Sequence, residues 1–225
     1  MQDERAAAPR DGVGPVGGMV ELVTAISMTV GRGALARVVA ETAGLTRADR
    51  VVDVGCGPGT AVRQASRLGA AATGIDPSAL MLRFAHWICR IERARNVTWI
   101  EGTAEHLPIP RGQATVLWAI SSLHHWTDRT AGLSECLRVL APGGRLLLAE
   151  RLTRPDARGH QSHRLTRAGA EDLARHLAAI GFSEVELQTR RAGHRRLVII
   201  RAMAAADIVM RKPVPVPPVP ATGPT

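Results

Sequence analysis

The sequence has few cysteines and no long apolar run. Its three cysteines are widely spaced and form no C-x-x-C pair, which argues against a disulfide framework and against a zinc site. No apolar stretch approaches the roughly 18 residues needed to span a bilayer. The N-terminus lacks the basic and then apolar pattern of a signal peptide. We therefore expect a cytoplasmic protein with buried, inert thiols and no membrane partner.

The sequence has a single lysine, so its positive charge comes almost wholly from arginine. The net charge is +9, and Lys212 is the only lysine. A basic balance favours acidic substrates or nucleic acid. These arginines are scattered among acidic residues instead of forming one run, so we keep nucleic acid only as an alternative partner.

The 225 residues are expected to form one domain with short additions at both ends. Residues 1–18 are rich in Gly, Pro and Ala and are expected to be a flexible segment. Residues 19–201 form the expected domain, and its first part, 19–44, is expected to supply two helices that cover the site. Residues 202–225 are expected to be a disordered tail, because their prolines exclude helix and central strand. The alternative is that this tail docks a partner.

Short apolar strands alternate with helical patterns from residue 50 onward. The expected strands are 50–55, 71–76, 97–101, 114–120 and 145–150, and the expected helices are 59–68, 78–94, 130–140 and 167–181. This alternation predicts a mainly parallel sheet with helices on both faces. Two further strands, 183–191 and 194–202, are joined by a tight link and predict an antiparallel hairpin at the sheet edge.

Three glycines at alternate positions follow the first strand, in "VVDVGCGPGT". A dinucleotide-binding loop needs G-x-G-x-x-G, but Thr60 stands in place of the third glycine, and Pro58 lacks an N–H for phosphate. No Gly-Lys-Ser/Thr follows, which excludes a Walker-type loop. Asp76 ends the second strand about 20 residues later, where an acid accepts ribose hydroxyls; capping the next helix is its alternative role. The pattern indicates a nucleoside site without a strong phosphate site.

Five segments in order resemble the class I S-adenosylmethionine-dependent methyltransferases: "VVDVGCGPGT", "GIDPS", "EGTAEHLPIP", "WAISSLHHWTD" and "LRVLAPGGRLLLAE". The sequence is most similar to the small-molecule methyltransferases that carry D-x-G-C-G-x-G and L-H-H-W signatures, over about residues 35–201. The resemblance implies an α/β, Rossmann-like, doubly wound, seven-stranded and mostly parallel sheet, with one antiparallel strand from the edge hairpin and helices on both faces. It also implies S-adenosylmethionine as cofactor.

The same resemblance implies a set of cofactor-binding residues: Asp53, Gly55, Cys56, Gly57, Asp76, Pro77, Ser78, Thr103, Ala104, Glu105 and Ala119. The glycine loop would line the methionine end, and Asp76 would bind the ribose. Relatives usually have an acid where this chain has Thr103, so its hydroxyl would accept a hydrogen bond from the adenine amine without charge. Ala119 would touch the methionine moiety through its backbone. Arg32 is either a partner of the methionine carboxylate or a solvated arginine at a helix end.

One histidine is the candidate catalytic residue. Where a methyl acceptor must lose a proton, imidazole is a suitable base near neutral pH. His124, in "SSLHHWTD", is expected to face the transferred methyl group as a base or positioning group. The alternative is that His124 and His125 only cap the loop above Trp126. No acid stands at Ala119 to hold Mg²⁺, so no metal is expected.

We therefore expect an enzyme that moves a methyl group to an O, N, S or C atom of a small molecule. The fourth strand lacks an Asn/Asp-Pro-Pro-aromatic run, which argues against methylation of nucleic-acid bases. The alternatives are an RNA or protein methyltransferase, and a non-catalytic relative that binds a nucleoside or a partner protein. A hydride-transfer enzyme is disfavoured by the missing third glycine.

Overall fold

A computed structural model describes residues 32–153, 165–193 and 195–206. The elements in chain order are α2 (Arg32–Ala43), β1 (Arg50–Val54), α3 (Thr60–Arg67), β2 (Ala71–Asp76), α4 (Ala79–Ile91), β3 (Val97–Glu101), β4 (Ala114–Ile120), η1 (Leu123–His125), α5 (Arg129–Val139), β5 (Leu140–Arg151), α6 (Arg167–Ile180), β6 (Phe182–Ala192) and β7 (Arg195–Ala204). None of the helices in these ranges is long and apolar enough to cross a membrane.

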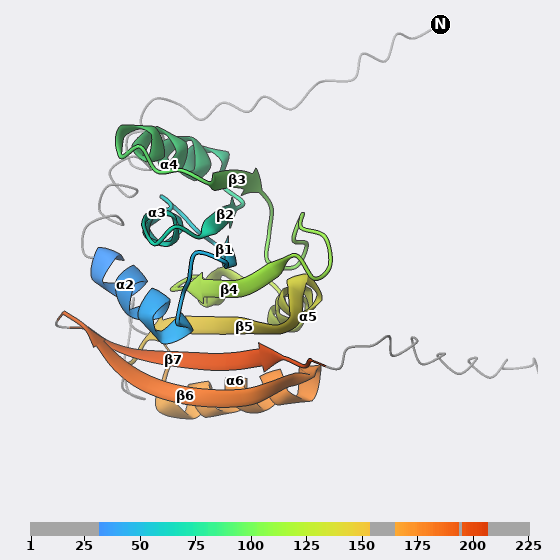
Figure 1. The fold of residues 1–225 in the computed structure, drawn as a ribbon. Helices are drawn as coiled ribbons and strands as arrows, with labels where there is room; N and C mark the ends of the chain where they lie inside the picture. The colour runs from blue at the N-terminus through green and yellow to red at the C-terminus, as the bar shows by residue number, and fades with distance from the viewer. Residues whose placement is uncertain (1–31, 154–164, 194, 207–225) are drawn as a thin grey trace, which may run out of the picture.

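The strands form one seven-stranded sheet in the order β3-β2-β1-β4-β5-β7-β6, from top to bottom in Figure 1. Every pairing from β3 to β5 is parallel, and β7 runs antiparallel to both β5 and β6. The predicted fold class is therefore confirmed. Strand order reverses between β1 and β4, which makes the carboxyl ends of these strands the expected ligand crevice.

Both faces of the sheet are covered, which explains why its strands are continuously apolar. In β4, Val116 and Trp118 pack in a core with residues of α2 and α3. The intervening Leu117 and Ala119 belong to a second core with residues of α5 and α6. Because successive side chains of a strand point to opposite faces, a strand between two helical layers must be apolar at every position.

The bounds of two strands differ from the expectation. β5 begins at Leu140, not at residue 145, because Leu140 pairs with Ala114 before the register shifts. Gly143, at φ 72°, lets the strand pass through the expected "APGG" turn. β7 continues to Ala204, into the segment assigned to the tail. The flexible 1–18 segment, the helix expected over 19–30 and the tail from 207 onward lie outside the described residues.

The glycine loop after β1 is shaped by close packing as well as by backbone angle. Gly55, Gly57 and Gly59 all have positive φ, at 72°, 51° and 71°. A Cβ on Gly59 would lie 2.2 Å from the Trp99 ring, and a Cβ on Gly55 would lie 2.5 Å from the Ser122 Cβ. Neither position can hold a side chain without moving its neighbour.

We expect Gly59→Ala to destabilise the protein more than Gly112→Ala. Both glycines have φ near 70°, at 71° and 70°, but nothing lies within 4 Å of a Cβ on Gly112. Both variants carry the backbone strain, and only Gly59→Ala adds overpacking, which costs about 1–3 kcal/mol. Urea unfolding measures the difference in the free energy of unfolding. Equal losses in the two variants would contradict the packing argument.

Candidate functional site

A cavity of about 450 Å³ opens where the strand order reverses. Its walls come from the start of α2, from the loops after β1, β2, β3 and β4, and from the first turn of α4. The residues that line it are Arg32, Val54, Gly55, Gly57, Asp76, Pro77, Met81, Gly102, Thr103, Ala104, Glu105, Ser121, Ser122, His125, Trp126 and Thr127. The cavity is large enough for a small organic ligand.

Asp76 joins two of these loops. Its Oδ2 accepts a hydrogen bond from the Gly57 N–H at 2.7 Å, and its Oδ1 accepts one from the Ser78 N–H at 3.0 Å. The side chain is buried but reaches the cavity wall. A carboxylate has about four acceptor positions, so these two bonds fix the carboxylate and leave capacity for hydroxyl donors of a ligand.

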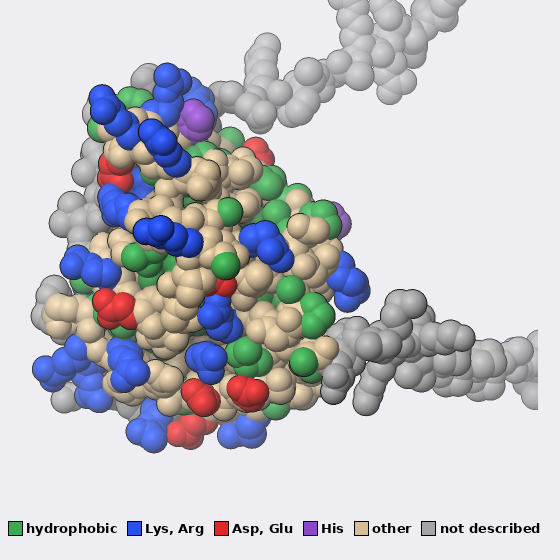
Figure 2. All heavy atoms as spheres, in the orientation of Figure 1, with side chains coloured by type: hydrophobic (Ala, Val, Ile, Leu, Met, Phe, Trp, Pro, Cys, Tyr) green, Lys and Arg blue, Asp and Glu red, His purple; other side chains and the backbone are tan. Residues whose placement is uncertain are grey.

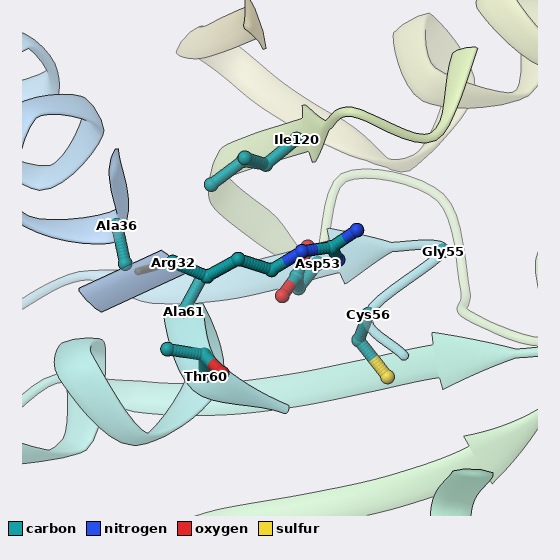
Figure 3. A pocket seen from close by; sticks show the side chains of 8 residues that line it. All are labelled: Arg32, Ala36, Asp53, Gly55, Cys56, Thr60, Ala61 and Ile120. Carbon is teal, nitrogen blue, oxygen red and sulfur yellow. The ribbon is translucent and has the colours of Figure 1, made fainter. Parts of the chain in front are cut away.

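A second, smaller cavity of about 20 Å³ lies beside the first and shares Arg32 and Gly55 with it. Figure 3 shows the Arg32 side chain reaching from α2 to the carboxylate of Asp53. Burial lowers the pKa of Arg32, while the negative charges of Asp53 and Glu150 counter the shift. Arg32 is therefore directed inward toward acidic groups and is not a solvated residue at a helix end.

Asp53 is an unusually basic carboxylate. Burial and the nearby charge of Asp76 raise its pKa to about 7, against the lowering effects of Trp118 and Arg32. Only 2% of the residue is exposed. A cation placed in the small cavity would favour the ionised form of Asp53.

Glu105 connects the loop after β3 to the loop after β4. Its Oε1 accepts hydrogen bonds from the Thr127 N–H at 2.7 Å and the Asp128 N–H at 3.1 Å. Burial acts to raise the pKa of Glu105, but hydrogen bonds from backbone N–H groups and from Thr103 outweigh it and lower the pKa. The carboxylate thus holds the cavity wall together, in addition to lining it.

Two serines that follow β4, Ser121 and Ser122, line the cavity, although the sequence analysis did not select them. Ser122 Oγ donates a hydrogen bond to the Val54 carbonyl at 2.7 Å and so ties the loop after β4 to β1. Ser121 has φ 52°, a strained value for a residue with a side chain. Its buried Oγ has no hydrogen-bond partner among the described residues, and neither does Trp126 Nε1. Both atoms are buried behind the cavity wall that the two residues line.

The two histidines have different surroundings. His124 Nδ1 lies 3.7 Å from Glu150 Oε1, and Glu150 is buried and also accepts from the Leu123 N–H at 3.1 Å. The rings of His124 and His125 are 4.0 Å apart between centroids. His125 lines the cavity, whereas His124 is absent from its described wall. Burial and the charge of His124 lower the pKa of His125, which favours its neutral form.

The structure brings most of the sequence-predicted site residues to the two cavities. Gly55, Gly57, Asp76, Pro77, Thr103, Ala104 and Glu105 line the larger one, and Asp53, Gly55 and Cys56 line the smaller one. Ser78 instead caps α4, where its Oγ accepts from the Met81 N–H at 3.3 Å. The side chain of Ala119 is buried toward α5 and α6, and within β4 only Ile120 lines a cavity. The expected backbone contact of Ala119 with the methionine moiety stays a prediction.

Several wall residues carry no signal in the sequence that would select them, among them Met81, Ser121 and Ser122. Arg32 was recognised only as one of two alternatives. Within the described ranges, no group of three or more His, Cys, Asp or Glu residues could hold a metal ion.

Residues 52–148 match a protein family described as "Methyltransferase domain". The fold is similar to that of a crystal structure of an S-adenosylmethionine-dependent methyltransferase from Aquifex aeolicus, which superposes with a TM-score of 0.70 at 18% identity, over 81% of this chain and 98% of that one.

Two curated relatives are similar in sequence. The chain is 38% identical over 107 residues to demethylmenaquinone methyltransferase of Tropheryma whipplei (strain Twist), which is 48% of this chain and 44% of that protein. It is 32% identical over 153 residues to 27-O-demethylrifamycin SV methyltransferase of Amycolatopsis mediterranei (strain S699), which is 66% of this chain and 55% of that protein. The chain therefore spans about half the length of these relatives.

We expect Asp53 to make the protein less stable as the pH rises. The pKa of Asp53 is about 7 in the folded state and has an ordinary value of 3.8. Between these values the folded state holds a proton that the unfolded state has released, so stability falls as pH increases, by about 3 kcal/mol between pH ~5 and pH ~8. Asp53→Asn removes this loss, and unfolding in urea at the two pH values measures it.

The exposed Asp128 provides the matched control for this experiment. Asp128→Asn leaves the pH dependence in place, because Asp128 lies at the N-terminus of α5 and not in the buried cluster. The same stability difference between Asp53→Asn and wild type at both pH values would show that the pKa of Asp53 is not raised.

Proposed function

We propose that this protein is an enzyme that transfers a methyl group from S-adenosylmethionine to an O, N, S or C atom of a small molecule. The observation that carries the proposal is the fixed carboxylate of Asp76 on the wall of the 450 Å³ cavity, where the strand order reverses between β1 and β4. The match to a methyltransferase domain and the fold support the same assignment.

The chemistry of the wall residues fits this cofactor. Asp76 has free acceptor capacity for the two ribose hydroxyls. Arg32 and Asp53 present one cation and one acid side by side, which complements the carboxylate and ammonium of an amino-acid moiety. Thr103 and Ala104 line the cavity, and in this proposal they contact the adenine. No Lys or Walker-type loop is needed, because the cofactor carries no phosphate.

The cofactor supplies a methyl group on a positively charged sulfur, which is already a strong electrophile. The residues of the chain then have to align the acceptor and exclude water, and alignment alone provides roughly 7–11 kcal/mol. We keep His124 as the proposed base for the acceptor's proton, although it is outside the described cavity wall: its ring lies 4.0 Å from the ring of the wall residue His125, and its Nδ1 lies 3.7 Å from Glu150 Oε1. The neutral form of His125, on the cavity wall, would position the acceptor.

The acceptor itself is proposed to be a small organic molecule with apolar surface. Met81 and Trp126 supply apolar wall, and Thr103 and Thr127 supply polar side chains on the same wall. The two curated relatives are named for demethylmenaquinone and 27-O-demethylrifamycin SV, both small molecules. The scattered arginines leave RNA as the second acceptor class to test.

We expect Asp76→Ala to raise the dissociation constant for S-adenosylmethionine by about 10–100-fold. The variant loses hydrogen bonds from a charged acceptor to the ribose, each worth about 1.5–3 kcal/mol. Calorimetric titration of the purified chain measures the constant. The control is Glu101→Ala, because Glu101 is an exposed carboxylate at the end of β3 outside the described cavity wall. Wild-type protein that does not bind S-adenosylmethionine would overturn the proposed function and favour a different ligand.

We expect His124→Ala to lower kcat by about 10²–10⁴-fold, the usual contribution of a general base. The dissociation constant for S-adenosylmethionine should stay unchanged, because His124 is not in the described cofactor wall. The measurement is transfer of a labelled methyl group to small metabolites, with the products identified by mass. His86→Ala, at an exposed position of α4, is the control. A His124→Ala variant with nearly full turnover would remove the catalytic role.

A further inference from the structure

Helix α4 has an exposed face that the proposed reaction does not use. Its inner face packs into the core through Leu82, Ala85 and Cys89. The outer face follows the same helical spacing and consists of Arg83, His86, Trp87, Arg90 and Ile91, all exposed. We call these five residues the α4 outer face.

The centre of the α4 outer face is apolar. Trp87 is 58% exposed and Ile91 is 61% exposed, the highest values among the large hydrophobic residues of the described ranges. Phe84 stacks against Trp87 with ring centroids 5.9 Å apart, which holds the indole in place. Trp87 and Ile91 line a shallow hollow together with His86 and Arg90. An ordered tryptophan beside an aliphatic side chain in water favours contact with another apolar phase.

The rim of this face is positively charged. Arg83 lies four residues before Trp87 and Arg90 three residues after it, and neither pairs with a carboxylate of the described residues. Figure 2 shows arginine side chains gathered at the upper left, where α4 lies in Figure 1. Two more exposed arginines, Arg93 and Arg95, follow the helix.

The one acidic residue of this segment does not neutralise the rim. Glu92 is the only acid between residues 79 and 95. Its Oε2 already accepts hydrogen bonds from Arg63 and Arg67 of α3. The surface therefore combines an apolar centre with an uncompensated positive rim.

We propose that the α4 outer face docks on a membrane surface that contains anionic lipids. Tryptophan is favoured at the boundary between headgroups and acyl chains, and Ile91 supplies the apolar contact, while the arginines meet anionic headgroups. Single-stranded nucleic acid fits less well, because one face of the indole is occupied by Phe84 and an exposed isoleucine offers no ring for a base to stack on. The contact is peripheral and requires no spanning segment.

The position of the face gives this docking a consequence for the cavity. Met81, on the cavity wall, precedes Trp87 by six residues on the same helix, a distance of about 9 Å along the axis. A docked molecule would hold its cavity close to the lipid headgroups. The docking itself does not depend on the methyl-transfer proposal, because none of the five residues lines the described cavity.

Flotation of the full chain with lipid vesicles tests this proposal. We expect binding to vesicles of phosphatidylcholine mixed with phosphatidylglycerol, little binding to phosphatidylcholine alone, and weaker binding as salt rises. The double variant R83Q/R90Q should lower the partition coefficient by about 30-fold or more, given about 1 kcal/mol per arginine near the surface. The double variant W87Q/I91Q should lower it by a similar factor, because it removes the apolar contact with the lipid. Wild-type tryptophan emission should shift to shorter wavelength on the anionic vesicles, and the W87Q/I91Q variant should lose most of this shift.

The control variants on β6 match the loss of two arginines and include the loss of one exposed apolar side chain. R190Q/R191Q removes two exposed arginines, and L187Q removes an exposed leucine; both should change the partition coefficient by less than about threefold. Unchanged melting temperatures show that all variants are folded. The proposal is overturned if the wild-type chain does not float with anionic vesicles, or if the β6 controls lose as much binding as the α4 variants. It is also overturned if the chain binds single-stranded RNA through the α4 outer face and does not float.

Discussion

The candidate site depends on one carboxylate that bridges two loops. Asp76 lies at the end of β2, and its two oxygens accept hydrogen bonds from Gly57, after β1, and from Ser78, before α4. These bonds hold the glycine loop against the start of α4 and leave the acid on the cavity wall. The loop can take this path because glycine tolerates positive φ. The glycines also have no side chains, which leaves room for Ser122 and Trp99 to pack against the loop. The atoms that hold the two loops together are therefore the same ones to which the proposed function assigns ligand recognition.

The second constraint is electrostatic. Three acids, Asp53, Asp76 and Glu150, lie near one cation, Arg32, in a region largely shielded from water. Burial alone would disfavour all of these charges, and mutual attraction only partly offsets this, as the raised pKa of Asp53 and the lowered pKa of Arg32 indicate. A ligand that carries both an ammonium and a carboxylate would complete this arrangement. The same group of charges thus restricts the ligand groups that can lie against Arg32 and Asp53.

Sequence patterns predicted the fold almost completely, because the alternation of apolar strands and amphipathic helices reports burial on two faces directly. The glycine loop and Asp76 were also predictable, since local backbone geometry requires them. The wall formed by β4 was not. The side chain of Ala119 points toward α5 and α6, so the contact expected of its backbone stays a prediction, and the two serines that follow β4 line the cavity. Which residues after a strand line a cavity depends on where the strand ends, and contacts with neighbouring loops determine that position.

The sequence by itself determined the class of fold, the glycine loop after β1, and the acid at the end of β2, because each of these is encoded in residues close together along the chain. Only the tertiary structure decided which histidine lies on the cavity wall, that Glu105 holds two loops together, and that Arg32 points inward to Asp53. It also decided that Trp87 and Ile91 remain exposed on a helix whose apolar residues could equally have been core. These features depend on contacts between segments far apart in the sequence, so their side-chain directions follow from packing and not from local pattern.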